Sequence, residues 1–292
     1  MLKCNLNCIL FDKADEGMYN HNIGVDSMIF CFKLTKGLYW GVVVPLSIIL
    51  MLAVSFLIEK DLISYFVFFV VLSVGTRILQ RLALKKYTEK NKVLDEKCDC
   101  ESFRDWQYEM LSKKLKGGYK NLVELNLATA HYYYGDFQQM KQTLEAIDIS
   151  RMNKRSIIYL YCYYRLWFLY HMMLSNMPEA EKVLSKIDSL VLPSDEKQKK
   201  HCENIVRISH LSVESKKFQV PDIEEKLKMI RFTDDLLAIV CEKSFLGKYY
   251  LRNGMRDEAK ECFEFVAEHG NNLFIAKAAK EILKENLNKG EI

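Results

Sequence analysis

The hydrophobic pattern of this chain begins with two uncharged apolar runs that lie close together, residues 38–58 and 62–76. Neither run is divided into a wet and a dry face, as a helix of a soluble core would be. The first holds about 20 residues, enough for a helix to cross the roughly 30 Å hydrocarbon layer of a bilayer. The second run is shorter. It can cross the bilayer only if the helix extends over residues 62–79 and Arg77 reaches the interface with its charged head. We therefore predict a transmembrane helical hairpin over residues 38–80.

Two alternatives stay open for these runs. Pro45 removes a backbone donor and can kink the first helix, which would suit a re-entrant hairpin in one leaflet. A cleavable signal peptide fits less well, because residues 1–11 lack an apolar core and the acidic residues Asp12, Asp15 and Glu16 follow at once.

Basic residues flank the hairpin on both sides. Lys33 and Lys36 precede it, and a larger set follows, namely Arg77, Arg81, Lys85, Lys86, Lys90 and Lys92. Lysine and arginine near membrane spans collect on the cytoplasmic side. We therefore expect a multi-pass protein of the cell (inner) membrane with both termini in the cytoplasm. Residues 1–37 would be a cytoplasmic N-terminal segment, 81–100 a basic juxtamembrane linker, and the 59–61 tip would face outward.

From Glu101 onward, apolar residues recur at intervals of three and four, which predicts a series of helices and an all-α fold. Glycine, proline and serine interrupt the pattern every one or two helix lengths. The first of these helices is expected over 101–115 and the last over 271–287. The water-facing domain would thus cover residues 101–292.

The predicted helices repeat a common pattern around their turns. A large residue and a small one, such as Leu127 and Ala128, stand about two turns before the break, and an apolar stripe follows it. The turn residues and their stripes are Gly135 with Met140, Leu144 and Ile147; Ser175 with Ala180, Leu184 and Ile187; and Gly254 with Ala259, Phe263 and Val266. No single hairpin buries both of its stripes, so such units must stack.

These units resemble the tetratricopeptide repeat family. The matching residues are Leu127–Ala128, Tyr132, Gly135–Asp136–Phe137 and Met140 in one unit, and Leu246–Gly247, Tyr250, Gly254 and Ala259 in another. The spacing of about 40 residues exceeds the roughly 34 usual for the family, so a degenerate unit is expected over 201–231. The resemblance implies an α-solenoid of helix-turn-helix repeats that binds a protein or peptide.

Few residues point to catalysis or metal binding. The sequence contains no phosphate loop, dinucleotide fingerprint or histidine pair bracketing a glutamate. Cys98 and Cys100 lack the second ligand pair of a zinc site and are expected to be exposed thiols. His131 and His171 hold equivalent repeat positions and are expected to be packed. We therefore predict no catalytic residue, no cofactor and no metal.

Composition narrows the classes of partner. The nine cysteines are scattered and odd in number, so we expect reduced thiols rather than a disulfide framework. A net charge of +4, without a basic stripe interleaved with aromatic residues, does not favour nucleic acid. Protein or peptide partners are what the resemblance to the repeat family implies.

Stacked hairpins offer a concave surface lined by the first helix of each unit. On it we expect the partner-binding residues Asn126, Thr129, Tyr133, Arg165, Lys248 and Arg252. Such side chains could clamp a carboxylate or an extended backbone, although charges on a helix face are commonly only solvated. The leading prediction is a membrane-anchored adaptor that binds partners at the inner membrane surface.

Two other functions stay open. The hairpin could pack against other transmembrane helices through small residues such as Ser47, Ser55, Ser64, Ser73 and Gly75. The chain would then be a regulatory or assembly subunit of an integral membrane complex. An enzyme with an unrecognised site is the third, because distant residues can assemble a site without a local motif.

Overall fold

The computed structural model describes residues 35–58, 61–115, 117–151, 157–230 and 234–287. Every regular element in these ranges is a helix, so the all-α prediction is confirmed. The chain divides into two compact units, and the boundary lies between Lys90 and Asn91. This point is inside helix α4, which runs from Asp61 to Lys97. A helix thus occupies most of the segment that was expected to be a linker.

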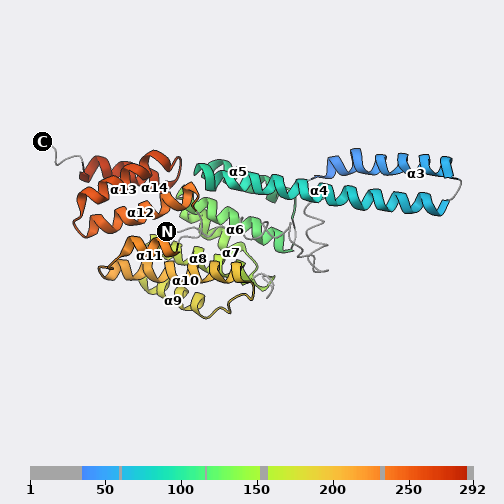
Figure 1. The fold of residues 1–292 in the computed structure, drawn as a ribbon. Helices are drawn as coiled ribbons and strands as arrows, with labels where there is room; N and C mark the ends of the chain where they lie inside the picture. Colours follow the sequence, from blue (N-terminus) through green and yellow to red (C-terminus); the bar gives the residue numbers. More distant parts are fainter. Residues whose placement is uncertain (1–34, 59–60, 116, 152–156, 231–233, 288–292) are drawn as a thin grey trace. The chain divides into compact units, whose positions relative to one another are not determined.

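The first unit contains the two apolar runs as helices. A π-helical turn η1 (Tyr39–Val43) leads into α3 (Val44–Ile58), and α4 runs beside α3 (Figure 1). Two segments, Thr35–Phe56 and Tyr65–Lys97, are long and apolar enough to cross a membrane. By length and composition alone, the core helix of a soluble protein or a signal sequence would pass the same test. The predicted tip, 59–61, lies mostly outside the described residues.

Polar groups inside these helices are satisfied locally. The hydroxyls of Ser47 and Thr76 each donate to the carbonyl four residues earlier, at 2.7 Å in both cases. This leaves neither hydroxyl in need of water. Large apolar side chains are exposed on both helices, for example Phe56 (88%) and Phe66 (69%). The unit therefore presents an apolar surface to its surroundings.

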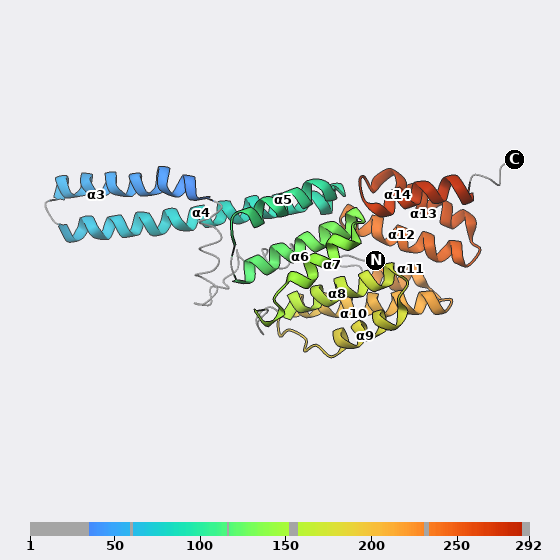
Figure 2. The same ribbon diagram turned by 180° about the vertical axis from the view of Figure 1, so that it is seen from behind.

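The second unit is a series of helices that pack against their neighbours in sequence (Figure 2). These are α5 (Cys100–Ser112), α6 (Gly117–Tyr134), α7 (Phe137–Ala146), α8 (Ile157–Met173), α9 (Met177–Asp188), α10 (Glu196–Lys217), α11 (Ile223–Ile230), α12 (Leu236–Arg252), α13 (Arg256–His269) and α14 (Phe274–Ile282), with short helical turns η2 (Ile149–Arg151) and η4 (Leu283–Leu287). The helix pairs α6/α7, α8/α9, α10/α11 and α12/α13 coincide with the four predicted units. We call the earlier helix of each pair its first helix.

The turns of three pairs have the same hydrogen-bond geometry. The N–H groups of Asp136, Asn176 and Met255 each donate to the carbonyl five residues earlier, at 2.9, 2.9 and 3.0 Å. This bond closes a Schellman motif, which needs a left-handed residue just before the donor. Gly135, Ser175 and Gly254 supply it with φ of 93°, 56° and 76°. The aligned turn positions in the sequence are thus structurally equivalent.

The apolar stripes after these turns are buried, as their common offsets predicted. All nine stripe residues are at most 6% exposed. In the last unit, the small residue of the large-small pair, Gly247, lies where α12 and α13 cross. A Cβ placed on Gly247 would lie 3.0 Å from the ring of Phe263. The repeated apolar positions therefore correspond to buried positions in the helix pairs, and in the last unit to a close helix crossing.

The last helix joins the end of the series to its beginning. In α14, Ala276 and Ala279 are buried whereas Lys277 and Lys280 are exposed, so the helix has one packed side and one solvated side. Phe274 also packs edge to face on Tyr132 of α6, with ring centroids 5.5 Å apart. Helix α14 therefore contacts the first hairpin as well as α12 and α13.

The segment before α14 caps the start of α5. The Asn272 side-chain oxygen accepts the Cys100 N–H at 2.9 Å, and its amide donates to Asp99 at 3.0 Å. Cys98 and Cys100 are fully buried. The prediction of exposed thiols at these two positions is wrong, because the C-terminal segment covers them.

A candidate anion-binding pocket

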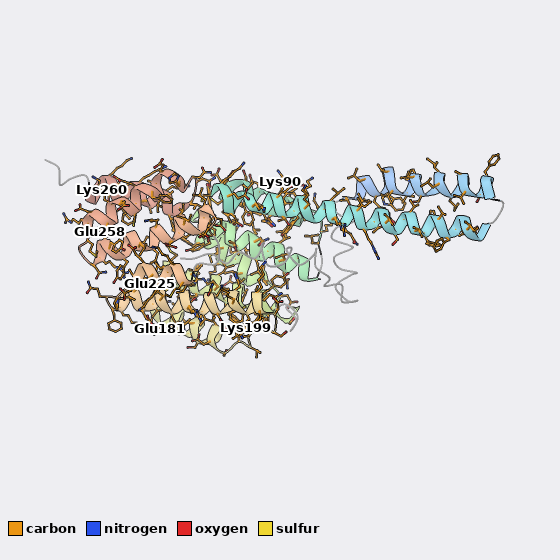
Figure 3. The ribbon with its side chains drawn as sticks, viewed as in Figure 1. Lys90, Glu181, Lys199, Glu225, Glu258 and Lys260 are labelled. Atoms are coloured by element: carbon orange, nitrogen blue, oxygen red, sulfur yellow. The ribbon has the colours of Figure 1, made fainter. Side chains whose placement is uncertain are left out.

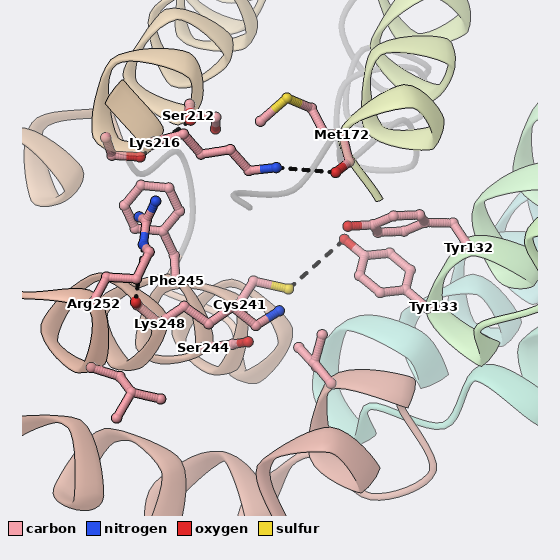
Figure 4. Close-up of a pocket in the computed structure, with 13 residues that line it drawn as sticks. Tyr132, Tyr133, Met172, Ser212, Lys216, Cys241, Ser244, Phe245, Lys248 and Arg252 are labelled. Atoms are coloured by element: carbon pink, nitrogen blue, oxygen red, sulfur yellow. Dashed lines mark hydrogen bonds between the residues drawn. The ribbon is translucent and has the colours of Figure 1, made fainter. Parts of the chain in front are cut away.

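A pocket of about 350 Å³ opens among the first helices of the second unit (Figure 4). Its walls come from α6, α8, α10 and α12, and α14 adds one residue. The lining residues are Tyr132, Tyr133, Met172, Ser212, Ser215, Lys216, Cys241, Ser244, Phe245, Lys248, Leu251, Arg252 and Ile275. The lining therefore comes mainly from the first helices of successive hairpins.

Three of the lining residues are cationic, and no lining residue is acidic. Lys216 donates from Nζ to the Met172 carbonyl at 3.2 Å, which ties the end of α10 to the end of α8. The Arg252 Nε donates to the Lys248 carbonyl at 3.3 Å, within α12. Figure 4 shows these groups around one opening. The pocket thus concentrates positive charge that no lining carboxylate neutralises.

Partial desolvation disfavours this positive charge, most of all at Lys248, because Lys216 and Arg252 are exposed over much of their surface. Desolvation lowers the pKa of Lys248, and the charge of Lys216 lowers it further. The pKa of Lys216 falls for the same two reasons, burial and the neighbouring charge of Arg252. The pKa of Arg252 is lowered mainly by burial. An anion in the pocket would relieve each of these unfavourable contributions.

The other lining groups form an apolar wall with neutral polar tips. Burial raises the pKa of Tyr132 and Tyr133, so both phenols stay protonated and uncharged. The Cys241 thiol lies 4.0 Å from the Tyr133 hydroxyl. Ser212 directs its hydroxyl to the Ile208 carbonyl at 2.6 Å. These groups add no negative charge to the pocket.

A fourth cation lies close to this wall. Arg165 of α8 is 1% exposed and donates from Nη1 to the Ser209 hydroxyl at 2.6 Å. Burial lowers its pKa to about 10, while the neighbouring Tyr132, Tyr133 and Cys241 act in the opposite direction. The guanidinium thus lies beside the pocket wall without lining the pocket.

The structure brings together half of the predicted partner-binding residues. Tyr133, Lys248 and Arg252 line the pocket. Asn126 and Arg165 are buried at 2% and 1% exposure, so the prediction that they are presented on a surface is wrong. Thr129 is half-buried and donates its hydroxyl to the Leu125 carbonyl at 2.9 Å. The accessible site is therefore shorter than the concave surface that was predicted.

Lys216 is the charged pocket residue that the sequence reading missed. It lies in the last turn of α10, as Arg252 lies in the last turn of α12. A basic residue in the last turn of a first helix is the signal that could have identified it. The degenerate unit contains no glycine turn residue against which the two positions could be aligned.

The other candidate groups are packed. His131 exchanges a hydrogen bond with the Tyr108 hydroxyl at 3.1 Å, and His171 stacks on Trp167, so both are packed as predicted. Within the described ranges, no group of three histidine, cysteine or acidic residues could hold a metal ion. Cys98, Cys100, Cys202, Cys241 and Cys262 are not disulfide-bonded. Cys162 is disulfide-bonded, contrary to the expectation of reduced cysteines.

Away from the pocket, the second helices of the hairpins carry charges of both signs. Glu181 of α9, Glu225 of α11, and Glu258 and Lys260 of α13 belong to the second helices of their hairpins (Figure 3). Both signs of charge are present there. The uniform positive charge is thus a property of the pocket and not of the unit as a whole.

Comparison with protein-family models, curated proteins and solved structures found no match.

Proposed function

We propose that this protein is a membrane-anchored adaptor. Its two apolar helices would form a transmembrane hairpin, and its second unit would be a short tetratricopeptide-like solenoid in the cytoplasm that binds a protein or peptide. The observation that carries the proposal is the pocket, because its charged and aromatic lining comes from the first helices of successive hairpins. An anchored binding surface raises the local concentration of its partner at the membrane.

The proposal favours a localised contact over a long groove. Since Asn126 and Arg165 are buried, a partner segment would meet Tyr133, Lys248 and Arg252 rather than all six predicted residues. Arginine and lysine recognise carboxylates through charge-assisted hydrogen bonds, which are stronger than neutral ones. A short anionic segment of a partner therefore suits this surface.

The alternative, a subunit of an integral membrane complex, has less support. Two of the small residues that could mediate contacts with other spans are used inside the hairpin. Ser47 is fully buried, and a Cβ on Gly75 would lie 2.7 Å from the side chain of Val43. The same hairpin would serve either function, so the pocket is what favours the adaptor.

Charge reversal in the pocket tests partner binding. Lys248→Glu combined with Arg252→Glu is expected to weaken partner capture by about tenfold or more, because each lost charge-assisted contact removes about 1.5–3 kcal/mol. Quantitative copurification from solubilised membranes measures the change. The matched control is Lys226→Glu combined with Lys228→Glu on α11, where both lysines are exposed. Capture that is lost in the control and retained in the pocket variant would place binding on the second helices.

Cysteine accessibility tests the topology. In intact cells, a membrane-impermeant maleimide is expected to label Asp61→Cys at the hairpin tip but not Glu89→Cys, whose parent side chain is 61% exposed. Opening the membrane should make Glu89→Cys reactive. The parent protein measures the background from its own thiols. Labelling of Glu89→Cys from outside would overturn the orientation, and a mature mass that lacks the first apolar helix would identify that helix as a signal sequence.

A further inference from the structure

We infer that the pocket is a binding site for a small organic anion, a molecule with a carboxylate head and an apolar body. This goes beyond the proposed adaptor function, because the site would bind its ligand without any protein partner. The ligand and a partner segment would compete for the same cations.

The lining of the pocket carries an unbalanced positive charge. Lys216, Lys248 and Arg252 line one opening, and no lining residue is acidic. Like charges in a partly desolvated pocket repel each other more strongly than they would in water. A bound anion lowers this repulsion, so the pocket favours negatively charged occupants.

Lys248 is the expected contact for the head group. The side chain is half-buried and lies in the pocket. Its Nζ makes no hydrogen bond or ion pair with any residue in the described part of the chain, whereas Lys216 is engaged with the Met172 carbonyl. A partly desolvated ammonium without an acceptor lacks the hydrogen bonds that water would supply. A carboxylate would supply them.

The remaining walls suit an apolar body. Met172, Phe245, Leu251 and Ile275 come from three helices and surround the same space. Small-molecule sites typically have volumes of roughly 300–1,000 Å³ and combine apolar walls with a few polar groups. At about 350 Å³ this pocket is at the lower end of that range. Asn126 and Arg165, which were also predicted to bind a partner, are buried and do not line the pocket.

Three probes separate head from body in a calorimetric titration of the full-length protein in nanodiscs. 4-Phenylbutyrate has both the carboxylate and the apolar body. 4-Phenylbutylamine keeps the body and reverses the charge, and inorganic phosphate keeps negative charge without the body. We expect 4-phenylbutyrate to bind at least tenfold more tightly than either of the other two probes.

Two variants locate the binding. Lys248→Gln is expected to weaken 4-phenylbutyrate binding about tenfold or more, with a melting temperature equal to or above that of the parent. Lys226→Gln, an exposed position on α11, should bind as the parent does. Arg252→Gln, at an exposed lining residue, serves if Lys248→Gln does not fold.

Each contrary result overturns a named part of the inference. Equal binding of the amine would remove the charge preference, and equal binding of phosphate would leave a site for simple anions only. Absence of 4-phenylbutyrate binding to the parent would overturn the site itself. Unchanged binding in folded Lys248→Gln, or in Arg252→Gln where that variant replaces it, would place the ligand elsewhere.

Discussion

Gly135→Val is expected to lower the free energy of unfolding of the helical unit by roughly 2–5 kcal/mol. Two costs add at this position. Gly135 has φ of 93°, where a residue with a Cβ is disfavoured by about 1–2 kcal/mol. A Cβ would also lie 2.8 Å from the Cβ of Phe274, and overpacking of this kind typically costs about 1–3 kcal/mol. Denaturant unfolding followed by circular dichroism measures the loss.

Gly254→Val is the matched control. Gly254 occupies the equivalent turn with φ of 76°, but a Cβ there meets nothing within 4 Å. It should lose only the conformational part, about 1–2 kcal/mol. The difference between the two variants measures how firmly α14 docks on the first hairpin. Equal losses would mean that this docking does not stabilise the unit.

Acidification from about pH 6.5 to pH 4 is expected to remove about 3 kcal/mol of stability through His201 alone. The side chain is 1% exposed, and burial lowers its pKa from 6.5 to about 4. Between these values the unfolded chain binds a proton that the folded protein does not. Stability therefore falls as the pH falls through this window and levels off below about pH 4.

His201→Gln isolates this contribution, because glutamine does not titrate. Other groups change protonation in the same range, since burial also lowers the pKa of His131 and His171. The informative quantity is thus the difference between parent and variant in unfolding free energy, measured at several pH values. A difference that stays constant from pH 7 to pH 4 would show that His201 is not buried as the structure has it.

The local repeat could be predicted because it depends on spacing within one hairpin. The same offset separates Gly135 from Leu144 and Gly254 from Phe263. In the structure, the two glycines hold equivalent turn positions, and Leu144 and Phe263 are both buried. Helix periodicity and left-handed turn residues are local properties, so a single sequence contains them.

The errors concern contacts between residues far apart in the chain. Cys100 is buried because Asn272 caps its helix, a contact across 172 residues. Arg165 is buried where Ser209 on another hairpin accepts a hydrogen bond from its guanidinium. Nothing in the spacing near either residue specifies such partners, and an arginine on a helix normally remains solvated. Three of the six predicted residues therefore line the pocket, and the buried positions could not be recognised from the sequence.

Site-specific photo-crosslinking in native membranes tests most directly whether partners bind at the first-helix pocket. A photo-crosslinking amino acid replaces Phe245, which lines the pocket, or Met229, which is 66% exposed on the second helix α11. The proposed function predicts a specific cross-linked species from position 245 that Lys248→Glu with Arg252→Glu abolishes, and none from position 229. A cross-link from position 229 but not from position 245 would contradict it.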